Sequence, residues 1–394
     1  MTAGSQAEDL AGAEPEIVGL RFQEWLDDHA YEMEPFLEPE PQDVVDADRL
    51  HEQMIRLLYD AGWTRLGWPT EYGGLGGDVR LRAEVYDRLG RAHLAMPERL
   101  YPLEILAPAL IKYHPELATQ LVPRYLAGDE FWCQGFSEPD AGSDLASLRC
   151  RATSVDGGFV VQGQKVWTSN AQMSTRCMLL ARTGTPESRH RGLTMLMLDM
   201  NQPGLTVRPI RAATGADHLA ELYLDDVFVA DNRLVGDPGG GWGVAMYLLQ
   251  FERGMYAWMR QAVLHSRVEL IARQSTADPA LTAMLIGELR IAAAEVRAKC
   301  QGTLNRFAQG EILGPEVSVD KLLLSRAEQL VCDVARELLS PALEIGPGTP
   351  WTDWWRSAWY FSRAATILGG TREVQKGIVA ERLLGLPRGA SNGR

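Results

Sequence analysis

The sequence has 394 residues and a mass of 43.6 kDa, a length typical of two or three domains. With 46% hydrophobic and 23% charged residues it has an ordinary globular composition, which excludes wholesale disorder. The 52 acidic residues outnumber the 39 basic ones and give a net charge of −13. Nucleic acid is therefore not a predicted partner, because no basic excess is present to release its counterions.

No apolar run approaches the roughly 18 residues that a membrane-spanning helix needs. The first 20 residues carry four acidic side chains and no Lys or Arg, which argues against a signal or transit peptide. The five cysteines are scattered and match neither a disulfide framework nor a zinc motif, and no metal site is predicted. These features predict a cytoplasmic protein.

The chain from Glu16 to about Gly128 has the spacing of helices, interrupted by Pro and Gly clusters. We therefore predict an N-terminal α-helical domain over residues 1–129. Beyond Phe131 the pattern changes to short runs rich in β-formers, bounded by turn residues and without helices between them. This change predicts a middle antiparallel β-domain over residues 130–235, with strands expected in 149–155, 159–161, 193–200, 205–210 and 219–229.

From residue 243 to residue 385 the period is helical again, with breaks at 277–279, 314–315 and 346–350. Long helices separated by short breaks form bundles, so we predict a C-terminal α-helical bundle over residues 236–394. The order of helices, sheet and helices predicts an α+β fold class.

Two stretches of the predicted β-domain carry the most chemical information. Residues 136–144 read Phe-Ser-Glu-Pro-Asp-Ala-Gly-Ser-Asp, a loop whose backbone N–H groups and Ser oxygens can approach a polar ring edge. Taken alone, this loop is most simply a hydrophilic turn. Residues 164–170 read Gln-Lys-Val-Trp-Thr-Ser-Asn and put the flat Trp167 beside two hydroxyl groups. A Trp in a strand is, by itself, most simply a core residue.

In this order the two motifs resemble the acyl-CoA dehydrogenase family of flavoproteins. Further matches lie at residues 221–229, 251–254, 368–375 and 380–383, so that the resemblance covers about residues 20–388 in all three parts. It implies a helical domain, a β-domain and a four-helix bundle with FAD between them. The implied reaction, in lipid metabolism, converts an acyl-CoA or acyl-carrier thioester to the 2-enoyl thioester.

The resemblance also implies the residues that contact the cofactor and the substrate. Ser169 would bond flavin N5, Trp167 would stack on the flavin, and Ser143 would meet the pantetheine. Thr371 lies where a helix begins, so it is equally well explained as an ordinary N-cap. The full set of implied FAD contacts is Gln134, Phe136, Ser137, Trp167, Thr168, Ser169, Thr371 and Glu373.

The reaction needs a carboxylate that removes the α-proton while the flavin accepts a hydride. In many family members this base is the Glu before the Gly-Thr of the C-terminal motif, but here that residue is Gly369. The resemblance to the isovaleryl- and long-chain-type branch moves the base to Glu252, on the first long helix of the C-terminal domain. Gly369 is expected to polarise the thioester carbonyl through its backbone N–H. Without a Cβ it is also expected to leave room for a bulky or branched acyl group.

The periodicity of that helix independently singles out Glu252, which lies on the flank of an apolar stripe. A carboxylate on an apolar face is rare unless it is paired or functional, and burial would raise its pKa. Pairing with a buried Arg is the simpler alternative. Arg253 projects to the opposite face, where contact with CoA or with a neighbouring subunit is expected. The stripe consists of Val244, Leu248, Phe251, Met255, Met259 and Ala262.

Two stretches depart from the family pattern, at residues 273–279 and 340–348, where family members reach the FAD of a neighbouring subunit. A homo- or hetero-oligomer, either dimer or tetramer, is therefore expected, with an electron-accepting flavoprotein as a further partner. An acyl-CoA oxidase, a flavin monooxygenase and a non-catalytic subunit of a heteromeric dehydrogenase remain as alternatives. The presence of Glu252 weighs against all three, because none of them needs a carboxylate there.

Overall fold

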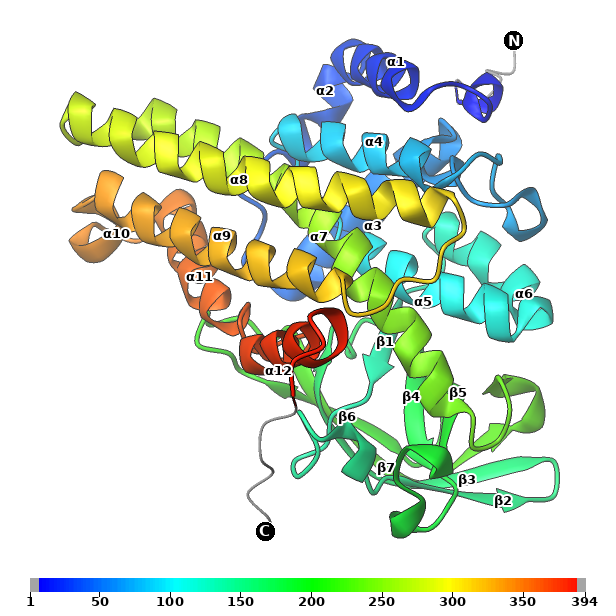
Figure 1. Cartoon of the computed structure of the whole chain (residues 1–394). Helices are drawn as coiled ribbons and strands as arrows, with labels where there is room; N and C mark the ends of the chain where they lie inside the picture. The colour runs from blue at the N-terminus through cyan, green and yellow to red at the C-terminus, as the bar shows by residue number, and fades with distance from the viewer. Residues whose placement is uncertain (1–6, 388–394) are drawn as a thin grey trace. The chain divides into compact units, whose positions relative to one another are not determined.

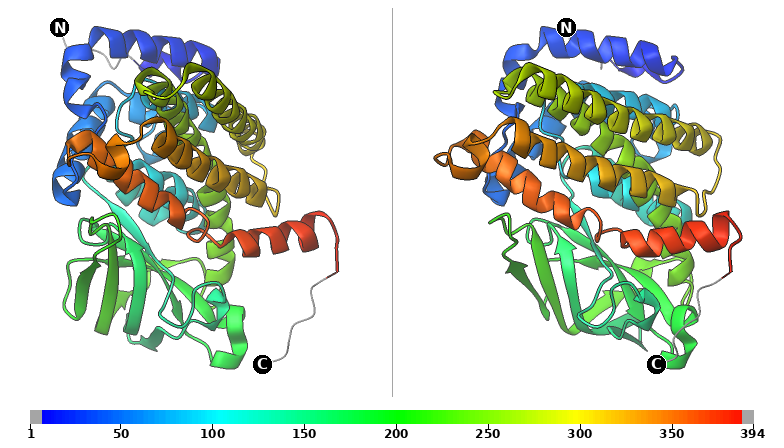
Figure 2. Two further views of the ribbon diagram at one scale, coloured as in Figure 1. Left: turned by 90° about the vertical axis from the view of Figure 1, so that its left-hand side faces the viewer. Right: turned by 60° about the vertical axis from the view of Figure 1, so that its left-hand side comes forward.

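The computed structural model describes residues 7–387 and divides the chain into two compact units, Met1–Phe251 and Glu252–Arg394 (Figures 1 and 2). The first unit contains the N-terminal helices and a β-sheet, and the second contains the C-terminal helices. The predicted α+β fold, with helices, sheet and helices in that order, is confirmed.

Within the described residues the N-terminal part consists of six α-helices, and short 3-10 turns lie between the second and third and between the third and fourth of them. Asp43 and Asp78 accept backbone hydrogen bonds at the starts of the third and fourth helices, as N-caps do. The rings of Phe22 and Trp63 lie 4.8 Å apart and belong to an aromatic cluster in the helical core. The helices are α1 (Pro15–Asp28), α2 (Ala30–Met33), α3 (Val44–Asp60), α4 (Val79–Arg91), α5 (Leu100–Tyr113) and α6 (Pro115–Leu126).

The middle part is one eight-stranded sheet in the order β6-β7-β3-β2-β4-β5-β8, with β1 paired to β4. The pairs are antiparallel except for β1 with β4 and β2 with β4. The sequence did not predict β4, because nearly all of its residues are buried and no alternation of polar and apolar residues remains. The strands are β1 (Trp132–Gly135), β2 (Arg151–Val155), β3 (Gly158–Ser169), β4 (Arg176–Arg182), β5 (Leu193–Asp199), β6 (Leu205–Ile210), β7 (Leu219–Ala230) and β8 (Leu234–Val235).

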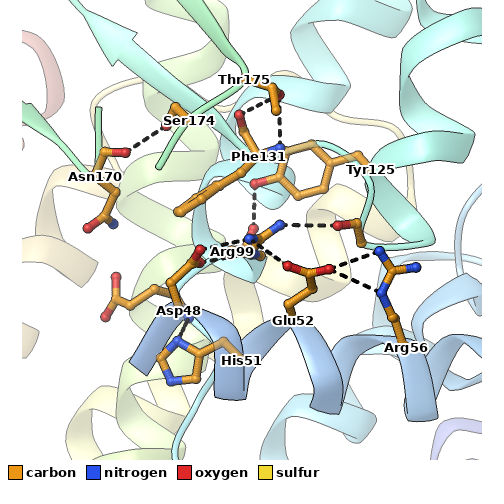
Figure 3. A network of polar contacts seen from close by, with 12 residues as sticks. Asp48, His51, Glu52, Arg56, Arg99, Tyr125, Phe131, Asn170, Ser174 and Thr175 are labelled. Atoms are coloured by element: carbon orange, nitrogen blue, oxygen red, sulfur yellow. Dashed lines mark hydrogen bonds and ion pairs between the residues drawn. The ribbon is translucent and has the colours of Figure 1, made fainter. Parts of the chain in front are cut away.

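A buried polar network joins the helices to the start of β1 (Figure 3). Arg99 donates to both carboxylate oxygens of Asp48, at 2.8 and 2.7 Å, and its guanidinium lies 5.0 Å from the centre of the Phe131 ring. The Tyr125 hydroxyl donates to the carbonyl of Arg99 at 2.6 Å. The carbonyl of Phe131 accepts the backbone N–H of Thr175, which precedes β4, and the N–H of Phe131 donates to the Thr175 hydroxyl. The network fixes β1, which leads directly into the loop at residues 136–144.

The second unit is a bundle of long helices, as predicted. The helix α7 (Gly241–Gln274) contributes its residues from Glu252 onward. In this part Arg260 pairs with Glu328 of α9 at 2.7 Å, and Arg267 lies over the ring of Trp354 in α11. The remaining helices are α8 (Pro279–Ala308), α9 (Val317–Leu338), α10 (Ala342–Ile345), α11 (Pro350–Ala364) and α12 (Arg372–Ile378), with a π-helical turn at Val379–Leu383.

Candidate active site

The loop at residues 136–144 is held against β3 by a buried ion pair. The Lys165 ammonium is fully buried and donates to Glu138 Oε1 at 2.8 Å and to the carbonyl of Phe136 at 3.0 Å. Glu138 also accepts the backbone N–H groups of Arg149 and Cys150. Removing one partner of such a pair typically costs about 3–5 kcal/mol, because a buried charge is left uncompensated. The pair therefore fixes the loop and β3 as one rigid piece.

A backbone bond completes this connection, since the N–H of Val166 donates to the carbonyl of Ser137 at 3.0 Å. The two sequence motifs thus become neighbours in space. Sequence reasoning missed Lys165 and Glu138 as a pair. The available signal was the single basic residue of the motif at 164–170, Lys165, beside three acidic residues in the motif at 136–144.

Trp167 stands at an irregularity of β3. Between Lys165 and Thr168 the strand has one residue more than its partner β7 has between Leu222 and Ala220, which is a β-bulge. Trp167 has φ +62°, an uncommon value for a bulky residue, and its side chain is 59% exposed. A large aromatic side chain held out of the core by strained backbone is typical of a ligand contact rather than of core packing.

The residues after Trp167 alternate between the two faces of the strand. Ser169 is exposed like Trp167, whereas Thr168 is 1% exposed and its Oγ1 atom is buried without a hydrogen-bond partner. Among the other predicted contacts, Phe136 is buried, Gln134 and Ser137 are half-buried, and Ser143 is exposed on the loop. The exposed Trp167 and Ser169, with the orphaned hydroxyl of Thr168, fit a planar, polar ligand such as a flavin.

We expect Trp167→Ala to weaken FAD binding about tenfold and to leave the folding temperature nearly unchanged. An aromatic pair contributes about 0.5–1.5 kcal/mol beyond its buried area, and 1.4 kcal/mol corresponds to a factor of ten. Equilibrium dialysis of FAD measures the affinity. Phe228→Ala is the matched control, because Phe228 is a 49% exposed aromatic residue in the same sheet. Equal FAD affinity in the two variants would contradict a flavin contact for Trp167.

Five of the six residues of the α7 stripe are buried as predicted, since Val244, Leu248, Met255, Met259 and Ala262 are each at most 1% exposed, whereas Phe251 is half-buried. Glu252 is half-buried beside this stripe. Its carboxylate approaches the loop before α12, since a Cβ built at Gly369 would lie 2.8 Å from Glu252 Oε1. The carboxylate therefore reaches the position where many family members carry their base. The expectation that Gly369 leaves free space needs correction, because Glu252 fills the space next to it.

Arg253 approaches the same loop, although helical projection placed it on the opposite face of α7. Its Nη2 atom is 3.8 Å from a Cβ built at Gly370, and its Nε atom is buried without a partner. Burial lowers the pKa of Arg253, the Glu252 carboxylate opposes that effect, and Arg382 adds to it. A projection of Cα directions does not show how far a long Arg side chain reaches from its helix face.

A hydrogen bond from a side chain of α12 fixes the loop that carries Gly369. Gln375 is fully buried and donates through Nε2 to the carbonyl of Gly369 at 3.2 Å. The Thr371 hydroxyl accepts the N–H of Val374, so Thr371 is the N-cap of α12. Glu373 is exposed and pairs with Arg372, whose guanidinium helps to lower the Glu373 pKa. Sequence reasoning did not single out Gln375.

Over residues 7–387, no cluster of three or more His, Cys, Asp or Glu side chains is arranged to hold a metal ion. No helix within that range is long and apolar enough to cross a membrane. A hollow of about 260 Å³ at Met197, Phe228 and Arg233 contains none of the predicted site residues.

Comparisons with known proteins identify the family of the chain. Three family models match: the acyl-CoA dehydrogenase N-terminal domain over residues 25–129, the middle domain over 133–227 and the C-terminal domain over 239–384. Acyl-CoA dehydrogenase IpdE1 of Mycobacterium tuberculosis is 38% identical over 345 residues, covering 84% of this chain and 87% of that protein. Acyl-CoA dehydrogenase FadE26 of the same organism is 30% identical and covers 86% of this chain and 88% of that protein.

Two solved structures share the fold. The Tcur3481-Tcur3483 steroid ACAD has a TM-score of 0.79 at 23% identity, over 95% of this chain and 99% of that chain. The ChsE4-ChsE5 complex of Mycobacterium tuberculosis has a TM-score of 0.77 at 24% identity, over 96% and 98%. With its three domain matches and its curated relatives, the chain belongs to the acyl-CoA dehydrogenase family of FAD-dependent oxidoreductases.

Proposed function

We propose that the protein catalyses the α,β-dehydrogenation of a bulky acyl-CoA thioester, with FAD as its cofactor and Glu252 as the base. One observation carries this proposal: the Glu252 carboxylate lies beside Gly369, at the position where many family members carry their base. A monooxygenase or a non-catalytic subunit needs no carboxylate at that place, whereas an acyl-CoA oxidase, contrary to the expectation from the sequence, must remove the same α-proton.

The β-domain residues would hold the flavin. Trp167 and Ser169 are exposed on one face of β3, and the loop from Phe136 is tied to that strand through Lys165. FAD held there would supply the hydride acceptor for the β-carbon of the acyl chain. Thr371 and Glu373 would contribute further contacts. Thr371 already caps α12, so it would do so through its remaining hydrogen-bonding capacity.

Glu252 removes the proton from the α-carbon, and negative charge then develops on the thioester oxygen. The backbone N–H of Gly369 donates a hydrogen bond to that oxygen and stabilises the charge. Gln375 orients this donor, because it holds the carbonyl of Gly369. Ser143 and Arg253 would bind the CoA part of the substrate.

A bulky acyl group is supported by a structural neighbour rather than by free space at Gly369, because Glu252 fills the space next to that residue. One structural neighbour is described as a steroid ACAD, and we propose a polycyclic or branched acyl group of this kind. The proposed reaction is the same whether CoA or a carrier protein provides the thiol of the thioester.

We further propose that a second chain completes the FAD site and that a flavoprotein accepts the electrons. The stretches at residues 273–279 and 340–348 lack the family pattern for contacts across a subunit boundary. A hetero-oligomer supplies those contacts from a different chain. The ChsE4-ChsE5 neighbour is itself described as a complex.

Anaerobic mixing with straight, branched and polycyclic acyl-CoA thioesters tests the proposal. We expect the polycyclic or branched thioesters to bleach the flavin absorbance fastest, without an added reductant. A requirement for an external reductant would indicate a monooxygenase. No bleaching by any thioester, with the protein alone or copurified with a partner, would contradict dehydrogenation by this chain.

A further inference from the structure

The α9 helix carries a buried lysine beside the proposed base. Lys321 is 5% exposed, and its ammonium donates to the carbonyl of Ala365 at 2.8 Å. Ala365 lies at the end of α11, four residues before Gly369, so this bond fixes the start of the loop that carries Gly369. Sequence analysis did not select Lys321, because a single lysine in a long helix has no distinguishing pattern.

Lys321 and Glu252 approach the same point from two helices. A Cβ built at Gly369 would lie 2.8 Å from Oε1 of Glu252 and 3.8 Å from Cε of Lys321. The two side chains therefore flank one small space, with Glu252 on α7 and Lys321 on α9. Inside a protein, opposite charges interact much more strongly than they do in water.

Two carboxylates act on the Lys321 ammonium, Glu328 on the same helix and Glu252 on α7. Glu328 on α9 is already neutralised by Arg260 of α7, at 2.7 Å. Burial lowers the pKa of Lys321. The carboxylates of Glu328 and Glu252 raise this pKa, and the guanidinium groups of Arg253 and Arg260 lower it further. Arg382, in the π-helical turn, lowers the pKa of Arg253 by charge repulsion. Glu252 thus lies among cations from α7 and α9.

We propose that Lys321 is a positioning residue for the dehydrogenation: its buried ammonium anchors the Gly369 loop and keeps the neighbouring Glu252 carboxylate ionised. The inference rests on the proposed role of Glu252 as the base. A nearby cation favours the charged form of a carboxyl group and lowers its pKa. Removal of the Lys321 charge therefore raises the pKa of Glu252. The rate of flavin reduction depends on ionised Glu252. The pH at which this rate is half-maximal, on the acid side of the pH profile, therefore moves to a higher value.

The test measures flavin reduction by acyl-CoA in stopped flow from pH 5.5 to pH 9 in the holoenzyme. Lys321→Gln removes the charge but keeps an N–H donor for Ala365, whereas Lys321→Met removes both. We expect Lys321→Gln to raise the midpoint by about 1 pH unit, at the low end of shifts caused by a nearby charge. Lys321→Arg should restore the wild-type midpoint. Lys376→Met, which removes an exposed lysine of α12, should leave the midpoint unchanged.

A second readout needs no turnover. In thermal unfolding at pH 8, Lys321→Gln should lower the melting temperature more in the wild-type background than in the Glu252→Gln background, because the second background has lost the balancing charge. An unchanged midpoint together with additive melting temperatures would overturn the inference. Suppose that this outcome is found while wild type bleaches its flavin and Glu252→Gln does not. The proposed base then stands, and only the role of Lys321 is refuted.

Discussion

Glu252→Gln is expected to slow flavin reduction by acyl-CoA by about 10²- to 10⁴-fold, the usual effect of losing a general base. The amide keeps the shape of the side chain next to Gly369 but cannot accept the α-proton. FAD should stay bound, because the contacts proposed at the β3 bulge are untouched. Stopped-flow absorbance measures the reduction rate, and the absorbance ratio of the purified protein measures the FAD content.

Glu269→Gln is the matched control, since Glu269 lies on the same helix and faces Arg273 in an exposed ion pair. This variant should reduce flavin at the wild-type rate, because exposed ion pairs contribute at most about 1 kcal/mol. A Glu252→Gln variant that bleaches as fast as wild type would show that another group removes the proton. Loss of FAD from Glu252→Gln alone would instead assign Glu252 a structural role.

Gly369→Glu should nearly abolish the reduction of flavin by bulky acyl thioesters and lower the melting temperature. Gly369 has φ +64°, where a residue with a Cβ is strained by roughly 1–3 kcal/mol. Its Cβ would also lie 2.8 Å from Glu252 Oε1, so the base must move. Two carboxyl groups in one pocket raise the pKa of one of them, which removes the ionised base near neutral pH.

Gly377→Ala is the control for the cost of adding a Cβ in this region. Gly377 lies inside α12 with nothing within 4 Å of its built Cβ, so alanine should be neutral or stabilising by about 1 kcal/mol. Combining Gly369→Glu with Glu252→Gln relieves the like charges, and this double variant should regain part of the rate on straight chains. If Gly369→Glu keeps the wild-type rate and chain preference, position 369 does not face the substrate.

The sequence alone determined the features that depend on local pattern. Helical periodicity predicted the buried stripe of α7 and located Glu252 beside it, and the change of pattern near Phe131 marked the start of the sheet. Buried positions recur along a helix or a strand with the period of that element, so the spacing of apolar residues predicts them. The two motifs of the β-domain were sufficient to indicate the family, because their residue types and order are specific.

Only the tertiary structure decided which distant residues meet. The strand β4 is buried on both faces, so it lacks an alternating pattern, and the exposure of Trp167 depends on a bulge set by its pairing with β7. The approach of Glu252 and Lys321 to Gly369 joins three elements far apart in the chain. Sequence spacing reports which side of an element is buried, but the partner it is buried against is set by the packing of whole elements around a shared core.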